Sequence, residues 1–292
     1  MEINTRTAKT LVASPPWQPS VGRVRYHTVG TRKSVSRVQA LHSTETYAIA
    51  HERIPMPTQI EKMEAHAGHL LDVFIGLRER YALLHPMLFD QGTIGDRGSG
   101  EQSRGFGILR RSLFLSCAQD IAKLSLDADE RTPSILKIIN ALEDESLRRE
   151  LEDRYARWVL PPVEDEPDPE IVHALRRLEE HERLERRDQF LEHYRELQRL
   201  WLELSACQAM HGFRTVRDKI SAHTEVRYVA DKYQLVDIAT LGIKWGDLRS
   251  TIARMQRIIE LIGLIVRNAG FAWDSFEAQI SNAASRFWGA NA

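Results

Sequence analysis

The 292-residue sequence predicts an all-α protein, on three observations. Apolar residues recur at three- and four-residue steps almost everywhere after Ile60, the period of helices that bury one face. The stretches between them are rich in Gly, Pro or charged residues, as helix connections are. Residues 224–243 alone are rich in β-forming residues, and there we expect a short irregular or β-like insert with room for one brief strand.

Composition limits the classes of function. Hydrophobic residues make up 42% and charged residues 28%, the balance of a soluble globular protein. The net charge of -1 gives no general attraction to nucleic acid or an anionic membrane, so a polyanion site requires a local basic cluster. The longest apolar run, residues 258–266, is too short to cross a bilayer. Cys117 and Cys207 lack zinc spacing, and we expect reduced, buried thiols in a cytoplasmic protein.

The chain divides into three parts by pattern. Residues 1–55 show no helical period and few acidic groups, and we expect a disordered or extended tail there. Helix-like sequence begins directly after Met56, which makes Met56 an alternative start of the protein. We expect a helical domain over residues 56–270 and a C-terminal tail over residues 271–292.

Two helices are predicted in the first half of this domain. The first ends at the His85-Pro86 boundary, and the second covers residues 106–127, with a mobile Gly-rich loop over 90–105 between them. Their expected apolar stripes are Ile60, Met63, Ala67, Leu70, Leu71, Phe74 and Leu77, then Leu109, Leu113, Cys117, Ile121 and Leu124.

Four more helices follow. Thr132 is the expected cap of a third helix with Pro133 in its first turn, and a fourth covers 146–159. After a proline-rich hinge at 160–170, a long charged helix over 170–210 has a solvated face and the length of a helix pair or dimer surface. The last helix is capped near Asp247 and ends at Gly270. The expected stripe of the long helix is Ile171, Leu175, Leu178, Leu184, Leu191, Tyr194, Leu197, Trp201 and Leu204.

Most candidates for chemistry are weak. His66 and His69 lie one helical turn apart, but no third metal ligand is placed beside them, so we expect no metal. His173, His181 and His193 fall in the charged helix, where exposure explains them. The glycines of residues 90–105 lack a phosphate-binding lysine, and the standard hydrolase motifs are absent from the sequence. No cofactor is expected.

The stretch "RDKISAH", residues 217–223, is the strongest candidate. An arginine binds phosphate through a planar fork, and a histidine transfers protons near neutral pH, which are the two parts that RNA cleavage by an internal 2′-hydroxyl needs. On a straight helix, six residues would place Arg217 and His223 about 120° apart around the axis. The alternative interpretation is an ordinary charged helix end. The surrounding segment is locally basic through Arg214, Lys219, Arg227 and Lys232.

This stretch resembles the motif of the HEPN superfamily, and most closely that of its phage abortive-infection (Abi-type) branch. The matching residues are Arg217, Asp218, Lys219, Ala222 and His223. The helices expected near residues 108–142 and 247–266 are similar to those that flank the motif in this branch, so the resemblance covers about residues 60–268. The family often has Asn after the arginine, whereas this chain has Asp218, whose charge repels phosphate unless it is paired.

The resemblance implies an up-and-down bundle and a homodimer in which two motifs form one cleft. One His223 would take the proton of the 2′-hydroxyl and the other would protonate the leaving 5′-oxygen, while Arg217 holds the phosphate. Asp218 would orient Arg217. Further RNA contacts would come from Arg214, Lys219, Arg227 and a base stacked on Tyr228.

Two classes of function follow. The first is a metal-independent endoribonuclease of a toxin–antitoxin or phage-defence system, with RNA, a second copy of the chain and an antitoxin protein as partners. The second is a non-catalytic HEPN helical module that binds a nucleotide or a protein. In neither case do we expect a membrane partner.

Overall fold

The computed structural model describes residues 58–129, 131–157, 168–221, 226–229, 232–235 and 241–289. These residues form helices and a single two-stranded hairpin, so the predicted all-α class is confirmed. The predicted tail over residues 1–55 lies outside the described residues. No helix in the described ranges is long and apolar enough to cross a membrane.

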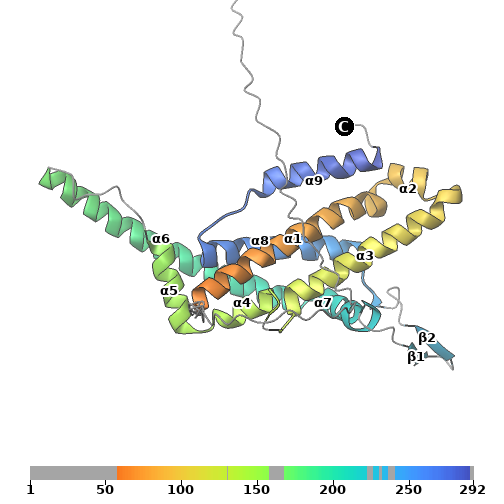
Figure 1. Ribbon diagram of the computed structural model, residues 1–292, viewed down its shortest axis with the longest axis horizontal. Helices are drawn as coiled ribbons and strands as arrows, with labels where there is room; N and C mark the ends of the chain where they lie inside the picture. Colours follow the sequence, from red (N-terminus) through yellow and green to blue (C-terminus); the bar gives the residue numbers. More distant parts are fainter. Residues whose placement is uncertain are drawn as a thin grey trace, which may run out of the picture. The chain divides into compact units, whose positions relative to one another are not determined.

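Helix α1 (Gln59–Phe89) lies at the centre and packs against α3 (Ser103–Leu126) and α8 (Trp245–Arg267) (Figure 1). Thr58 and Glu61 form a capping box that starts it. Six of its seven predicted stripe residues are buried, and Leu71 is partly buried against the core. Helix α8 is the most completely buried partner, because apolar residues follow each other closely from Leu248 to Val266.

Pro86 does not end α1, contrary to the prediction. The helix continues to Phe89, and the Asp90 amide closes its last turn on the Pro86 carbonyl. A proline this close to the helix end removes only the amide that would bond the Ala82 carbonyl. Leu84 and Met87 on either side are fully buried, and their burial favours continuation of the helix.

The predicted loop over residues 90–105 is largely helical. Asp90 accepts hydrogen bonds from the amides of Gly92 and Thr93 and caps α2 (Gln91–Arg97), and η1 (Gly100–Gln102) follows. Helix α3 then begins three residues earlier than expected. Its predicted stripe is buried at Cys117, Ile121 and Leu124, but Leu109 is exposed, and Phe106 and Phe114 are buried instead.

Two short helices lead to the long one. The N-cap of α4 (Ile135–Ala141) is Ser134 and not Thr132, so Pro133 precedes the helix. Asp144 caps α5 (Glu145–Ala156), which packs against α6 (Pro169–Ser205). The predicted hinge lies mostly outside the described residues, but its last residues belong to α6, with Asp168 as cap and Pro169 in the first turn.

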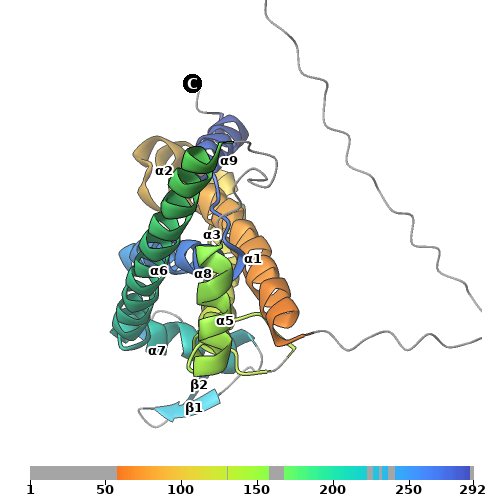
Figure 2. The ribbon, with the colours of Figure 1, turned by 90° about the vertical axis from the view of Figure 1, so that its left-hand side faces the viewer.

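The two halves of α6 differ in their surroundings. The C-terminal half packs on α5 and α8 and buries Leu197, Trp201 and Leu204, as predicted. The N-terminal half extends beyond the other helices (Figures 1 and 2). Here the predicted stripe is not buried within the single chain, because no described segment covers this half; its exposed members are Ile171, Leu178 and Leu184.

The long helix also ends earlier than predicted. Ala206 and Cys207 interrupt it, and α7 (Gln208–Thr215) and the π-helical turn η3 (Val216–Ser221) follow. The β-like insert contains two strands instead of one. They are β1 (Val226–Val229) and β2 (Lys232–Leu235), antiparallel with Val226 opposite Leu235.

The C-terminal segment is a helix and not a tail. Helix α8 begins after Lys244, with Asp247 in its first turn, and ends at Arg267, where left-handed Asn268 and not Gly270 forms the cap. Helix α9 (Trp273–Trp288) then packs on α1. Figures 1 and 2 both show α9 and α7 on opposite sides of the central helices.

Candidate arginine–histidine site

The candidate arginine lies in η3, directly after α7. Val216 is fully buried and Ile220 packs against the core, so one face of the turn is anchored. Arg217 and Asp218 remain partly exposed on the turn. In a π-helix each amide bonds the carbonyl five residues earlier, and such turns are frequent at functional sites. The chain therefore departs from the straight α-helix before it reaches His223.

A close contact positions α7 and with it η3. Gly212 is buried, and a Cβ at this residue would lie 2.6 Å from Cγ1 of Ile243. Only glycine allows Ile243 to pack directly on the α7 backbone without displacement. Phe213, in the next position, is fully buried among the core residues.

Arg217 and Asp218 form an ion pair. The Arg217 Nε donates a hydrogen bond of 2.7 Å to Oδ1 of Asp218, and the two side chains are 25% and 46% exposed. The terminal nitrogens of the guanidinium donate no hydrogen bond to a described residue. Arg217 therefore compensates the charge of Asp218, and Asp218 orients the guanidinium, whose forked end has no partner in the described part of the chain.

The other predicted site residues are placed only in part. Arg214 is exposed on α7, one turn before Arg217, and Lys219 is half-buried in η3. Arg227 and Tyr228 lie in β1, opposite Gln234 and Tyr233 of β2. His223 lies outside the described residues, so its meeting with Arg217 stays a prediction.

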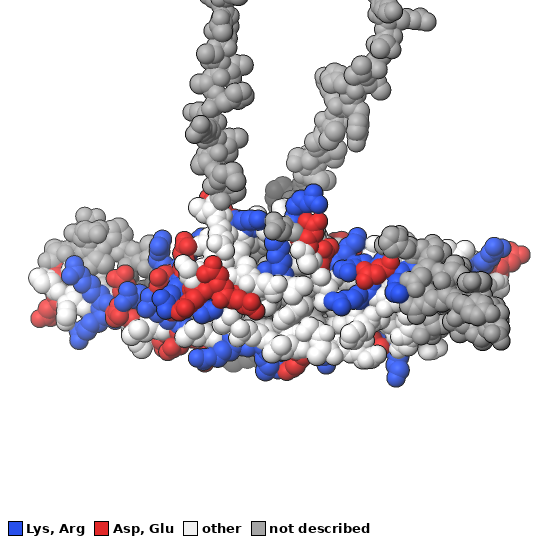
Figure 3. All heavy atoms as spheres, turned by 90° about the horizontal axis from the view of Figure 1, so that it is seen from below, with Lys and Arg blue, Asp and Glu red and all other residues white. Residues whose placement is uncertain are grey.

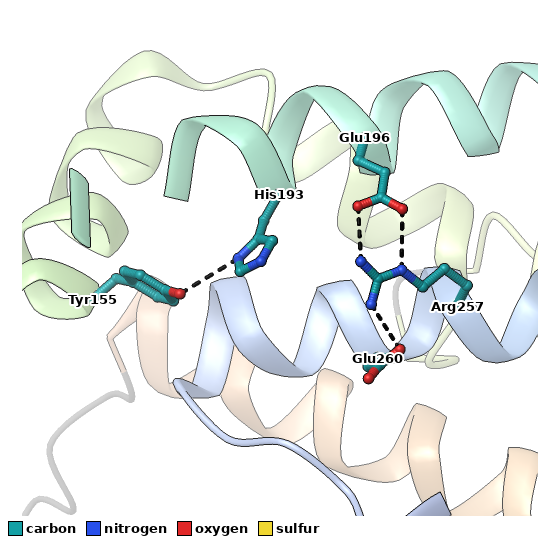
Figure 4. Close-up of polar contacts among 5 residues, drawn as sticks. All are labelled: Tyr155, His193, Glu196, Arg257 and Glu260. Atoms are coloured by element: carbon teal, nitrogen blue, oxygen red, sulfur yellow. Dashed lines mark hydrogen bonds and ion pairs between the residues drawn. The ribbon is translucent and has the colours of Figure 1, made fainter. Parts of the chain in front are cut away.

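The histidines of the described ranges lie apart from Arg217 or have other neighbours. His69 pairs with Asp72 at 3.7 Å, and burial lowers the pKa of His66, with further lowering from the charge of Lys137. Within the described ranges no three His, Cys, Asp or Glu side chains could hold one metal ion. His173 and His181 are exposed as predicted, but His193 is half-buried and lies 3.4 Å from the Tyr155 hydroxyl (Figure 4).

The cysteines match their prediction in part. Both are free thiols, and Cys117 is fully buried, which raises its pKa to about 12. Cys207 is only half-buried, because it occupies the break between α6 and α7.

A second arginine cluster was not predicted from the sequence. Arg257 of α8 donates two hydrogen bonds to Glu196 of α6, at 3.0 and 2.8 Å, and one of 2.9 Å to Glu260 (Figure 4). The hydrogen bond from Arg257 lowers the pKa of Glu196, and the two glutamates raise the pKa of Arg257. The contact between Arg257 and Glu260, three residues apart on one helix, could have been predicted from the sequence. The contact with Glu196 could not, because Glu196 is 61 residues from Arg257.

Charged side chains are mixed on the face shown in Figure 3. Lys and Arg lie between Asp and Glu over the described part of this face, in agreement with the net charge of -1. There is thus no broad basic surface on the part of this face that is described. A polyanion contact here would depend on local groups such as those of η3.

Comparison with known proteins decides the family. A family model described as AbiU2 (HEPN_AbiU2) matches residues 60–287, which is most of the chain. The chain belongs to this family. No curated protein and no solved structure was matched by the chain. The resemblance to abortive-infection HEPN proteins is therefore confirmed, and the AbiU2 match extends past residue 268 to include nearly all of α9.

Proposed function

We propose that this AbiU2-family chain is a metal-independent endoribonuclease of a phage-defence or toxin–antitoxin system. The observation that carries the proposal is the Arg217–Asp218 pair in η3, which leaves the guanidinium fork of Arg217 without a described partner. His223 follows six residues later in the motif. An RNA phosphate is the anion that this combination of groups suits.

In the proposed reaction, His223 of one chain removes the proton of a ribose 2′-hydroxyl. The 2′-oxygen attacks the adjacent phosphorus, and the bond to the 5′-oxygen breaks. His223 of the second chain protonates that leaving oxygen. Arg217 binds the non-bridging oxygens and stabilises the charge that develops on them. The products are a 2′,3′-cyclic phosphate and a 5′-hydroxyl.

The proposed site is complete only in a homodimer. Two-fold symmetry brings two copies of Arg217 and two of His223 into one cleft. Arg214, Lys219, Arg227 and Tyr228 would bind the RNA on either side of the scissile phosphate, and the basic residues among them would make binding weaken as salt concentration rises. An antitoxin protein would act by covering this cleft.

The test is RNA cleavage by the purified chain in EDTA. Arg217→Ala and His223→Ala are expected to lower the rate by about two to three orders of magnitude each, as loss of one transition-state donor does. Arg176→Ala and His181→Ala are matched controls, because both side chains are exposed on α6, and they are expected to leave the rate unchanged. Circular dichroism of each variant confirms its fold.

The dimer is tested by comparing the rate and the molecular mass as the protein is diluted. We expect the rate per chain to fall as the dimer dissociates. Full activity in a monomer would overturn the composite cleft. If the wild-type chain binds RNA or a nucleotide but cleaves nothing, the chain is a binding module and the proposal is wrong.

A further inference from the structure

A cavity of about 440 Å³ lies between α1, α8 and α9, within the range of small-molecule sites. Its α1 wall includes Arg78, Tyr81 and His85, and Arg249 of α8 is opposite. None of these residues belongs to the HEPN motif. The cavity is also separate from η3, which packs on α3 and α7.

Two residues that line the cavity each have a buried polar atom without a hydrogen-bond partner. Tyr81 is only 9% exposed, and its hydroxyl is buried without a hydrogen bond. The Nε of Arg78 is buried without one as well, although the Arg78 guanidinium forms an ion pair with Glu277 of α9 through Nη2. A buried, unpaired donor costs about 1–3 kcal/mol, so a small turn of either side chain that brings its donor to a ligand in the adjoining cavity would be favourable.

Positive charge dominates the polar part of the cavity. Arg249 is exposed and forms no ion pair with a described residue, whereas Arg78 is balanced by Glu277. Burial raises the pKa of Tyr81 to about 12 and lowers that of His85, and Arg249 lowers both pKa values by its charge. The field of Arg249 therefore reaches the same space that Tyr81 and His85 line.

The α9 wall contributes hydroxyls and an apolar surface. Ser281 and Ser285 line the cavity, and their side chains form no hydrogen bond to a described residue. Ile280 of α9 and Ile252 of α8 lie beside them. The site thus combines several hydrogen-bond donors with an apolar wall that can hold an organic group.

Helix α9 is held on α1 at both ends, so the cavity is a built feature of the fold. Near its start, Trp273 packs edge-to-face on Phe74 with ring centroids 5.8 Å apart. At its end, the Trp288 indole donates a hydrogen bond of 3.0 Å to the Leu83 carbonyl. The cavity lies along the stretch of α9 between these two anchors.

We infer that this cavity binds a small organic phosphate. The Arg249 fork has no ion-pair partner among the described residues, and the two serines supply further donors. A small turn of Tyr81 and Arg78 adds two more, which together exceed what the two oxygens of a carboxylate can use. Ile252 and Ile280 contact the organic group. The inference does not depend on the nuclease proposal, since it uses none of the residues of η3.

The test titrates phenyl phosphate into the full chain carrying Arg217→Ala, so that the HEPN motif contributes no phosphate site. We expect saturable binding by calorimetry and a rise in the thermal midpoint. Arg249→Gln should weaken binding at least about tenfold, the loss of about 1.4 kcal/mol. Tyr81→Phe should weaken it several-fold without lowering the midpoint of the ligand-free chain, because the lost hydroxyl has no partner. Arg176→Gln is the charge-matched control.

Two further compounds test which parts of phenyl phosphate are recognised. Benzoate has the ring but a carboxylate in place of the phosphate, and inorganic phosphate has no ring. Both are expected to bind at least about tenfold more weakly than phenyl phosphate. Absence of saturation by phenyl phosphate at about 10 mM would mean that water alone fills the cavity and would overturn the inference. Equal binding by wild-type and Arg249→Gln chains, or by phenyl phosphate and benzoate, would overturn it as well.

Discussion

Arg257 and Arg217 are both arginines at helix surfaces, but their surroundings differ. Arg257 uses all three guanidinium nitrogens on Glu196 and Glu260 and joins α8 to α6. Among the described residues, Arg217 donates through Nε alone, to its neighbour Asp218, and joins no two helices. The first arginine therefore has a structural role, whereas we propose that the fork of the second binds an anion. The number of guanidinium nitrogens that are hydrogen-bonded within the described chain thus distinguishes the structural arginine from the candidate functional one.

Replacement of the two arginines by alanine should therefore have opposite effects. Arg217→Ala is expected to slow RNA cleavage by about two to three orders of magnitude and leave the free energy of unfolding nearly unchanged. Arg257→Ala should lower that free energy by about 1 kcal/mol, since the cluster is partly exposed, with little change in rate. Rates in EDTA and urea unfolding measure both. A clear decrease in the free energy of unfolding of Arg217→Ala would contradict this difference between the two arginines.

Packing of Ile243 on the Gly212 backbone helps to position α7 and η3, and Gly212→Ala tests this contact. The added Cβ would meet Ile243 at 2.6 Å, and overpacking of this kind costs about 1–3 kcal/mol of unfolding free energy. Adding Ile243→Ala to the variant should recover part of the loss, because the clash disappears. If the double variant loses as much unfolding free energy in urea as the two single variants together, the contact with Ile243 does not cause the destabilisation by Gly212→Ala.

Asp218 is expected to act through Arg217. Asp218→Asn keeps an oxygen that can accept the Arg217 Nε hydrogen bond and removes a negative charge beside the phosphate, so cleavage should stay within a few-fold of wild type. Asp218→Ala removes the acceptor and should slow cleavage about tenfold. Equal rates for the two variants would show that Asp218 does not orient the arginine.

The Arg257 cluster should also respond to acid. The pKa of Glu196 is lowered in the folded chain, so its contribution to stability is complete above its ordinary pKa and is lost as pH falls through the lowered value. The stability difference between wild type and Glu196→Gln should therefore be constant from about pH 7 to 5 and shrink below about pH 4. A difference that grows with acid would contradict this sign.

Local patterns explain which parts of this fold were predictable. The apolar stripe of α1 was predicted because the spacing of apolar residues within one helix can be read from the local sequence. The stripe is buried almost as predicted. The end of α1 was not predicted, because burial of Leu84 and Met87 outweighs the local preference of Pro86. Helix α9 was missed as well, since its anchor joins Trp288 to Leu83 across 205 residues.

The candidate site divides in the same way. Arg217 and Asp218 were identified because they are contiguous in the motif, and their side chains do meet. The π-helical winding of η3 and the burial of Val216 against the core were not predicted, because residue spacing does not report tertiary contacts. The cavity beside Arg249 was not foreseen for the same reason, because its walls come from three helices far apart in the sequence.

The chemical identity of the ends of RNA cleaved in EDTA tests the proposed roles of Arg217 and His223 most directly. Mass spectrometry of the fragments is predicted to show a 2′,3′-cyclic phosphate and a 5′-hydroxyl, because the 2′-oxygen is the nucleophile. An all-DNA strand of the same sequence should remain intact. Fragments with a 3′-hydroxyl and a 5′-phosphate, or an RNA left intact by the wild-type protein, would contradict the proposed reaction.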